Sequence, residues 1–248
     1  MSLDCSCSSA RFPTDCSLEI DAPKPLERDV IDGDEKISDC AGEALVVFVI
    51  GIAGSGKSTV AKALARHLTA VYLDKDTVVT RFTEELLIQA GYSPGDRESD
   101  FYKQHIMPLE YLTLLDIGSE NIRQGMPVVF DAPFGAYFND AEYVTRTATQ
   151  ANWPKVRRVV LRVIVDKERN RQQLLARGLS RDERKLDQWD EFWASQQQMH
   201  CLWSDVEHFE LENPDDAAVA QLAERLLGHC RTGPRSPVKT SSSRPACG

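Results

Sequence analysis

The sequence contains no long hydrophobic segment and no leader-like start. Its longest apolar run, residues 44–50, is far shorter than the roughly 20 residues that a membrane-spanning helix needs. No basic stretch followed by an apolar one stands near the N-terminus, so we expect no signal peptide. Together these absences predict a cytoplasmic protein without a membrane partner.

Cysteine spacing gives no sign of a disulfide framework or a zinc site. None of the 7 cysteines belongs to a CxxC pair, and no histidine stands at zinc-finger spacing from Cys5, Cys7 and Cys16. We interpret the cysteines as unpaired thiols of a reducing compartment. A redox or metal role for the three N-terminal ones is the less favoured alternative.

Positive charge is in deficit. The formal net charge is −9, and an acidic surface repels the phosphates of nucleic acids. Nucleic acid is therefore an unfavoured partner, although a net charge leaves room for a local basic pocket. With 42% hydrophobic and 27% charged residues, the composition is otherwise that of an ordinary globular protein.

Both ends of the chain lack a sustained hydrophobic period. Residues 1–42 are rich in Ser, Asp, Pro and Cys, and residues 231–248 are rich in Ser and Pro, so we predict two disordered tails. Between them, residues 43–230 alternate short β-rich runs with helical periods. This alternation predicts one α/β domain whose parallel sheet is covered by helices on both faces.

The expected elements follow from hydrophobic periodicity and from turn residues. Strands are predicted at 44–50, 71–73, 127–131, 156–165 and 208–211. Helices are predicted at 58–68, 77–90, 98–123 with a bend near Pro108, 167–177, 187–201 and 215–229. The helical insertions after the second and fourth strands exceed a minimal βαβ unit, and we expect a substrate cover and a lid there.

The most specific motif lies between the first strand and the first helix, where the chain matches the G-x-x-x-x-G-K-[ST] pattern. The glycines let backbone N–H groups turn toward phosphate oxygens, and the helix N-terminus adds the positive end of a dipole. We expect Lys57 to contact the β- and γ-phosphates of ATP, and Ser58 to bind Mg²⁺. The expected nucleotide-binding residues are Gly51, Ile52, Ala53, Gly54, Ser55, Gly56, Lys57, Ser58 and Thr59.

Three classes of P-loop protein can be compared with the rest of the chain. A GTPase would need an Asn-Lys-x-Asp motif, which is absent. A motor or AAA-type ATPase usually has paired acids at the end of a hydrophobic strand, whereas the third strand here ends in the single Asp131. A kinase needs a carboxylate after the second strand and arginines on a movable lid, and both are present.

Two acids, Asp74 and Asp76, follow the second strand. On an extended chain, side chains at positions i and i+2 face the same way, so these two carboxylates are expected to share one metal and substrate site. We predict Asp74 as a Mg²⁺ ligand beside Ser58 and Asp131. The alternative is that Asp76 caps the helix predicted from Thr77.

A charge-dense segment at 177–185 follows the helix after the fourth strand, and Gly178 interrupts that helix. Such a run is often only a solvated face. Its place in an insertion that can fold over the phosphate loop instead favours a lid. We therefore take the arginines of this segment as candidates for neutralising the γ-phosphoryl group.

With these motifs the chain resembles the P-loop kinase-like AAA-type ATP-binding proteins, which include gluconate kinase, chloramphenicol phosphotransferase, the polynucleotide 5′-kinase domain and zeta toxins. The resemblance covers about residues 44 to 229. It implies a three-layer P-loop NTPase sandwich with five parallel strands in the order 2-3-1-4-5 and a helical lid. It also implies Asp76 as the base, Arg177 and Arg181 as contacts of the transferring phosphate, and ATP with Mg²⁺ as cofactors.

The expected activity is transfer of the ATP γ-phosphate to a hydroxyl group of a small molecule. Aromatic side chains in residues 81–111 and 133–139 suit an acceptor with a ring, although most of them also suit core packing. The sequence does not identify the acceptor. A zeta-toxin-like nucleotide-sugar kinase, a polynucleotide 5′-kinase and a non-kinase ATP-hydrolysing regulator are the alternatives.

Overall fold

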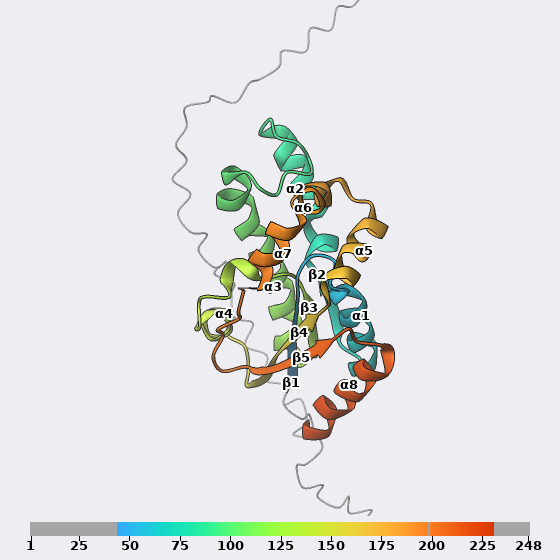
Figure 1. Ribbon diagram of the computed structural model, residues 1–248. Helices are drawn as coiled ribbons and strands as arrows, with labels where there is room; N and C mark the ends of the chain where they lie inside the picture. Colours follow the sequence, from blue (N-terminus) through green and yellow to red (C-terminus); the bar gives the residue numbers. More distant parts are fainter. Residues whose placement is uncertain (1–43, 198, 231–248) are drawn as a thin grey trace, which may run out of the picture. The chain divides into compact units, whose positions relative to one another are not determined.

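The five predicted strands form one parallel sheet in the order β2-β3-β1-β4-β5 (Figure 1). The computed structural model describes residues 44–197 and 199–230, so both predicted tails lie outside the described residues. The central strand has six buried residues out of seven, as its continuous apolar sequence predicts. The strands are β1 (Ala44–Ile50), β2 (Val71–Asp74), β3 (Val128–Asp131), β4 (Val156–Ile164) and β5 (Glu207–Glu212).

Helices cover both faces of the sheet. They are α1 (Lys57–Leu68), α2 (Lys75–Gln89), the π-helix η1 (Tyr102–Ile106), α3 (Met107–Arg123), the 3-10 helix η2 (Gly135–Tyr137), α4 (Tyr143–Gln150), α5 (Lys167–Arg177), α6 (Ser180–Asp187), α7 (Trp189–Gln197) and α8 (Asp216–Cys230). Apolar side chains of α1 and α8 pack on the face that contains Val47 and Val159. Those of α3 and α4 pack on the face that contains Phe48 and Phe130. The predicted three-layer sandwich is therefore confirmed.

The contact between α3 and the sheet depends on a glycine. A Cβ atom at Gly118 would lie 2.1 Å from Cζ of Phe130, so any larger residue would push the helix off β3. Phe130 in turn stacks on Phe48 with ring centroids 5.1 Å apart. This close packing fixes α3 against the centre of the sheet.

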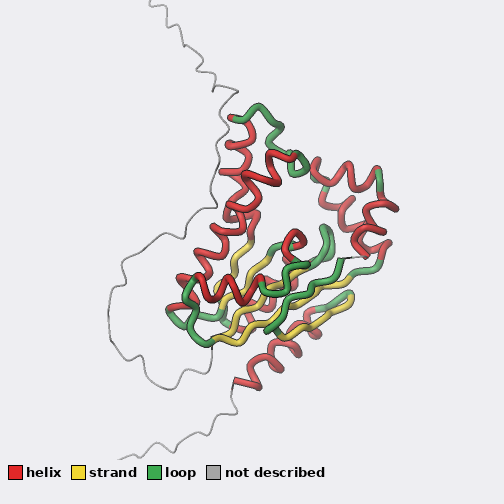
Figure 2. Tube along the Cα trace, turned by 90° about the vertical axis from the view of Figure 1, so that its left-hand side faces the viewer, coloured by secondary structure: helices red, strands yellow, loops and turns green. Residues whose placement is uncertain are grey.

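Two helical insertions extend beyond the same end of the sheet (Figure 2). We call residues 75–123, which comprise α2, η1 and α3, the arm, and residues 167–197, which comprise α5, α6 and α7, the lid. Because all strands are parallel, β2 and β4 deliver both insertions to the carboxyl end of the sheet. The phosphate loop, residues 51–58, leaves β1 at that end too.

Several helix boundaries differ from the predicted ones. α2 begins at Lys75 instead of Thr77 because Asp74 acts as its N-cap. The helix expected at 98–123 is interrupted by the π-helix η1, and Pro108 lies in the first turn of α3, where proline is tolerated.

The end of the lid also differs from the prediction, and one helix was missed. The helix expected at 187–201 is α7, which ends at Gln197, and α6 precedes it in the charge-dense segment. α4 was not predicted because its polar sequence buries only Tyr143 and Val144. Within the described residues, no helix is long and apolar enough to cross a bilayer.

Candidate active site

The phosphate loop adopts the conformation that its glycines allow. Gly54 and Gly56 have φ angles of 75° and 81°, a region that side chains with a Cβ rarely adopt. The backbone turns back on itself, since Ser55 N–H donates to the carbonyl of Ile52 over 3.1 Å. α1 begins directly after the loop, at Lys57, and N–H groups at such a helix start can donate to phosphate oxygens.

Helix α5 holds the loop from outside. The Asn170 side chain is fully buried and donates through Nδ2 to the carbonyl of Ala53 over 2.9 Å. Leu174 packs so closely that a Cβ at Gly54 would lie 2.7 Å from its Cγ. Sequence reasoning missed both residues, because nothing in the local pattern of α5 indicates a contact with a loop more than a hundred residues earlier.

Lys57 lies in one electrostatic neighbourhood with the predicted acids and with the lid. Burial lowers the pKa of its ammonium group, while Asp131, Asp76 and Asp74 oppose that shift and Arg177 adds to it. The structure therefore brings five of the predicted site residues together around the first turn of α1. Their roles in catalysis stay predictions.

Asp131 is buried with one oxygen satisfied and one not. The Tyr72 hydroxyl donates to Oδ2 over 2.8 Å, whereas Oδ1 has no hydrogen-bond partner among the described residues. Burial raises the pKa of this carboxyl, and nearby Lys57, Ser58 and Tyr72 oppose the rise. An incompletely paired buried carboxylate beside the Ser58 hydroxyl fits a Mg²⁺ site.

The unsatisfied polar atoms gather around the loop. In the described part of the chain, five buried side-chain atoms lack a hydrogen-bond partner. One of them, Asp182 Oδ2, belongs to the lid and forms an ion pair with Arg177. The other four are Ser55 Oγ, Asp131 Oδ1, Asn170 Oδ1 and Gln173 Oε1. Buried polar groups are usually paired, so this cluster indicates the place of a polar ligand.

The two acids after β2 have separate roles in the fold. Asp74 Oδ1 accepts from the Asp76 N–H over 3.1 Å and Oδ2 accepts from the Thr77 hydroxyl over 2.8 Å, so both oxygens of Asp74 serve the cap. The expectation of an extended chain through both acids was wrong, because α2 starts between them. The cap considered for Asp76 is provided by Asp74, and the role of Asp74 as a Mg²⁺ ligand stays a prediction.

Asp76 lies in the first turn of α2, with its side chain 43% exposed and Oδ1 3.5 Å from Nζ of Lys75. Lys75 is buried and also pairs with Glu110 Oε2 over 2.5 Å. Glu110 further accepts from the hydroxyls of Thr83 and Tyr102, over 2.7 and 2.8 Å. This network anchors the start of α2 to η1 and α3, and no sequence pattern had indicated it.

The lid brings Arg177 toward the phosphate loop. Arg177 ends α5, because Gly178 follows with a φ of 58°. Its Nη2 lies 3.1 Å from Oδ2 of Asp182, a carboxylate that is 1% exposed and that Lys185 also approaches to 2.8 Å. The side chain of Arg181, the second predicted lid arginine, lies outside the described residues, although its backbone belongs to α6.

The aromatic side chains expected on the acceptor side differ in how deeply they are buried. Phe134 and Tyr102 are core residues, with 0% and 5% exposure. Phe82 is 74% exposed on the arm. Tyr137 is half-buried and packs edge-to-face on Tyr111 at 5.0 Å, so this pair remains a candidate wall for an acceptor beside Asp76.

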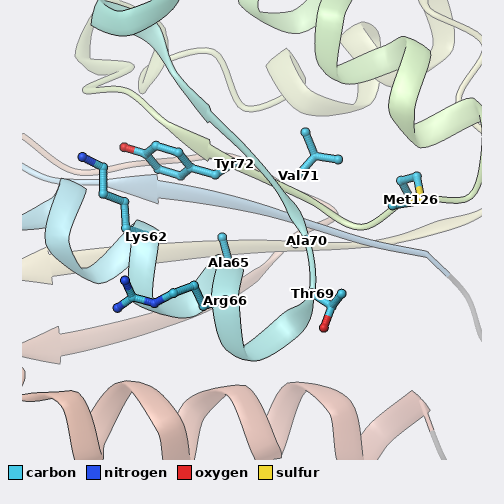
Figure 3. A pocket seen from close by; sticks show the side chains of 8 residues that line it. All are labelled: Lys62, Ala65, Arg66, Thr69, Ala70, Val71, Tyr72 and Met126. Carbon is cyan, nitrogen blue, oxygen red and sulfur yellow. The ribbon is translucent and has the colours of Figure 1, made fainter.

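A separate recess lies outside the edge strand β2 (Figure 3). It measures about 620 Å³ and is open to solvent, and it is lined by Lys62, Ala65, Arg66, Thr69, Ala70, Val71, Tyr72 and Met126. None of these residues belongs to the phosphate loop. Only Tyr72, through its bond to Asp131, links this recess with the nucleotide site.

Comparison with known proteins assigns the family. Residues 46–199 match the model of the family described as the AAA domain. The chain belongs to this family. Together with the strand order, this makes it a P-loop kinase-like AAA protein. No curated protein matches the chain.

Several solved structures are similar to this chain at low sequence identity, and one of them has a TM-score above 0.5. A candidate kinase from Chloroflexus aurantiacus has a TM-score of 0.53 and 15% identity, over 76% of this chain and 98% of that chain. A shikimate kinase from Bacteroides thetaiotaomicron has a TM-score of 0.43 and 18% identity, over 74% and 98%. A gluconokinase from Sinorhizobium meliloti has a TM-score of 0.43 and 15% identity, over 75% and 97%.

Proposed function

We propose that this protein is an ATP-dependent kinase that phosphorylates a hydroxyl group of a small molecule. One observation carries the proposal: the Asp76 carboxylate is within the electrostatic reach of Lys57, while Asp74 takes the capping role. A carboxylate at this position can orient an acceptor hydroxyl and take its proton. The Chloroflexus aurantiacus structure, a candidate kinase, agrees with this reading.

The residues around the loop fit Mg²⁺ and a nucleotide triphosphate. Ser58 and Asp131 would hold the metal ion, since the buried Asp131 carboxyl lies near the Ser58 hydroxyl and its Oδ1 has no hydrogen-bond partner among the described residues. No group of three or more His, Cys, Asp or Glu side chains that could hold a metal occurs among the described residues. Phosphate oxygens and water would then complete the coordination, as is usual for Mg²⁺. When bound, the ion neutralises charge on the phosphates.

In the proposed reaction, Asp76 orients the acceptor hydroxyl and takes its proton. The hydroxyl oxygen forms a bond to the γ-phosphorus as the bond from that phosphorus to the ADP oxygen breaks. Lys57 and Arg177 stabilise the charge that spreads over the phosphoryl oxygens. The partly exposed position of Asp76 leaves the acceptor a path to the carboxylate.

An acceptor screen tests the proposal. Purified protein is incubated with ATP and Mg²⁺, with and without a panel of hydroxylated metabolites and antibiotics, and ADP release is measured. The proposal predicts that one chemical class of acceptor raises ADP release strongly, and that Asp76→Asn removes the increase. Equal ADP release with every addition, unchanged by Asp76→Asn, would identify an ATP-hydrolysing regulator instead.

A further inference from the structure

The proposed reaction does not use a second pocket, which lies beside the carboxyl end of β1 and along the middle of β4 and the first half of β5. Its volume is about 350 Å³. The lining residues come from those three strands and from the segment after α7: Ile50, Val160, Arg162, His200, Cys201, His208, Phe209 and Glu210. Ile50 and Val160 are buried and form an apolar floor, while most of the remaining lining is polar.

Arg162 is the charged group of this pocket, and the described residues satisfy it only in part. Its Nη2 donates to the carbonyl of Met199 over 3.2 Å. Its Nη1 lies 3.6 Å from Oε1 of Glu210, which is an ion-pair distance but too long for a hydrogen bond. A guanidinium has five N–H donors, so most of its donor capacity faces the pocket or the solvent.

The other polar side chains of the pocket are two imidazoles and a thiol. His208 Nε2 lies 2.9 Å from the carbonyl of Trp203 and donates to it, so His208 lines the pocket and leaves Arg162 as the group that donates to a ligand. Burial raises the pKa of the Cys201 thiol, and a backbone hydrogen bond to Trp203 and the charge of Arg162 oppose that rise. Cys201 and Arg162 line the same pocket. A neutral thiol adds no negative charge that would compete with an anion.

Charge and geometry together favour an oxyanion over other ligands. The planar N–H fork of arginine matches the two oxygens of a carboxylate or phosphate. The side chain of Glu210 is 59% exposed, so a bound anion can replace it beside Arg162 without leaving a carboxylate buried and unpaired. A metal cation would be repelled by the guanidinium, and an apolar floor strengthens the attraction for an anion.

We propose that this pocket binds a small carboxylate or phosphate anion, with Arg162 as its charged contact and with His200 and His208 in its lining. None of the lining residues belongs to the phosphate loop, and the inference does not rest on kinase activity.

An NMR titration tests the site directly. The phosphate loop is first saturated with Mg²⁺ and a non-hydrolysable ATP analogue, so that it cannot take up the probe. Inorganic phosphate and succinate are then added in separate experiments, with glycerol as a neutral reference, and the imidazole signals are followed. We expect saturable shifts for His200 and His208 with at least one anion, and none for His67 and His105, which lie outside the pocket.

Variants identify the contact. Arg162→Gln should weaken binding by roughly tenfold or more, because a charged hydrogen-bonding group is lost. Arg158→Gln is the matched control: Arg158 lies on the same face of β4 and contacts the Thr145 hydroxyl outside the pocket. Glu210→Gln removes the competing carboxylate and should tighten binding, so the test stands even if Arg162→Gln folds poorly.

The titrations and the variants distinguish a specific anion site from its absence. Saturation by phosphate or succinate that depends on Arg162 supports the site, and the two titrations show which anion it prefers. Absence of saturable shifts with both anions, or equal shifts in wild type and Arg162→Gln together with no tightening in Glu210→Gln, would overturn it.

Discussion

The phosphate site and the arm each contain a buried carboxylate, but the two carboxylates differ in how completely the surrounding residues hydrogen-bond them. In the arm, Glu110 is 3% exposed and accepts from Lys75, Thr83 and Tyr102. In the phosphate site, Asp131 is 1% exposed and its Oδ1 has no partner in the described part of the chain. A buried charge that the protein satisfies by itself serves the architecture, whereas one left incompletely paired indicates a ligand.

Removing the fully hydrogen-bonded carboxylate of Glu110 should give the largest loss of stability. Glu110→Ala leaves the Lys75 ammonium buried without its close partner, and removal of one member of a buried ion pair costs about 3–5 kcal/mol. Denaturant unfolding followed by circular dichroism measures the change. Glu98→Ala is the control, because its pair with Lys103 is exposed on the same arm, and a cost of about 1 kcal/mol or less is expected there. Equal losses for the two variants would contradict the contrast.

Removing the loop lysine should affect turnover and leave stability intact. Burial already lowers the pKa of Lys57, so the folded protein does not depend on this charge in the way that it depends on Glu110. Lys57→Ala should lower acceptor-dependent ADP release by about a hundredfold to a thousandfold. Lys62→Ala, an exposed change on the same helix, should leave the rate unchanged. Wild-type turnover in Lys57→Ala would refute the assignment of the loop.

Asp131 offers a test in which stability and ligand binding change in opposite directions. Its pKa is raised in the folded protein. The stability that this shift contributes to the free energy of unfolding is therefore fully present below the unfolded-state pKa of about 3.9, and it is lost as the pH rises through the folded-state pKa. Asp131→Asn does not ionise and keeps an oxygen for the Tyr72 hydroxyl. Near pH 7 it should match or exceed wild type in Tm without ligands.

With ligands the order should reverse. A nucleotide at a hundred times its Kd stabilises a protein by about 2.7 kcal/mol, and Asp131→Asn should lose the Mg²⁺-dependent part of this gain. Calorimetry with and without Mg²⁺ and an ATP analogue measures it, with the exposed Asp116→Asn as control. An unchanged Mg²⁺-dependent rise in Tm would remove Asp131 from the metal site.

The smallest effect concerns the helix cap. Asp74→Ala removes the acceptor for the Asp76 N–H and the Thr77 hydroxyl, and loss of an N-cap costs about 1 kcal/mol. Asp74→Asn should retain most of that stability, since asparagine caps nearly as well. Chemical unfolding of the two variants compares them directly. An equal loss in both would show that the carboxylate charge matters more than the cap.

The sequence predicted the sheet and the loop well because their signals are local. Residues 44–50 and the helix after the loop have the buried strand and 3.6-residue patterns that a doubly covered sheet requires. The strand order came from the family resemblance and not from periodicity.

The missed features depend on contacts between distant segments. The start of α2 was misplaced because Asp74 and Asp76 are equally good caps, and only the strand register decides between them. Asn170 and Leu174 have no local pattern that points to the loop, although they pack on it. The π-helix before α3 likewise aligns Tyr102 with Glu110, a pairing that no spacing rule indicates.

In the proposed reaction, Asp76 acts on the acceptor hydroxyl and Arg177 on the phosphoryl group. Asp76→Asn keeps the shape of the side chain and should bind ATP normally. Its phosphotransfer should fall by roughly a hundredfold, the size of a lost general base, while its slow hydrolysis of ATP by water persists. Arg177→Ala should slow both reactions, because the phosphoryl group needs charge stabilisation whichever nucleophile attacks.

The most direct measurement is therefore the ratio of acceptor phosphorylation to residual ATP hydrolysis in wild type, Asp76→Asn and Arg177→Ala, with stability checked by thermal unfolding. The account predicts a ratio that collapses in Asp76→Asn and changes little in Arg177→Ala. A wild-type ratio in Asp76→Asn, with ATP still hydrolysed, would contradict the account.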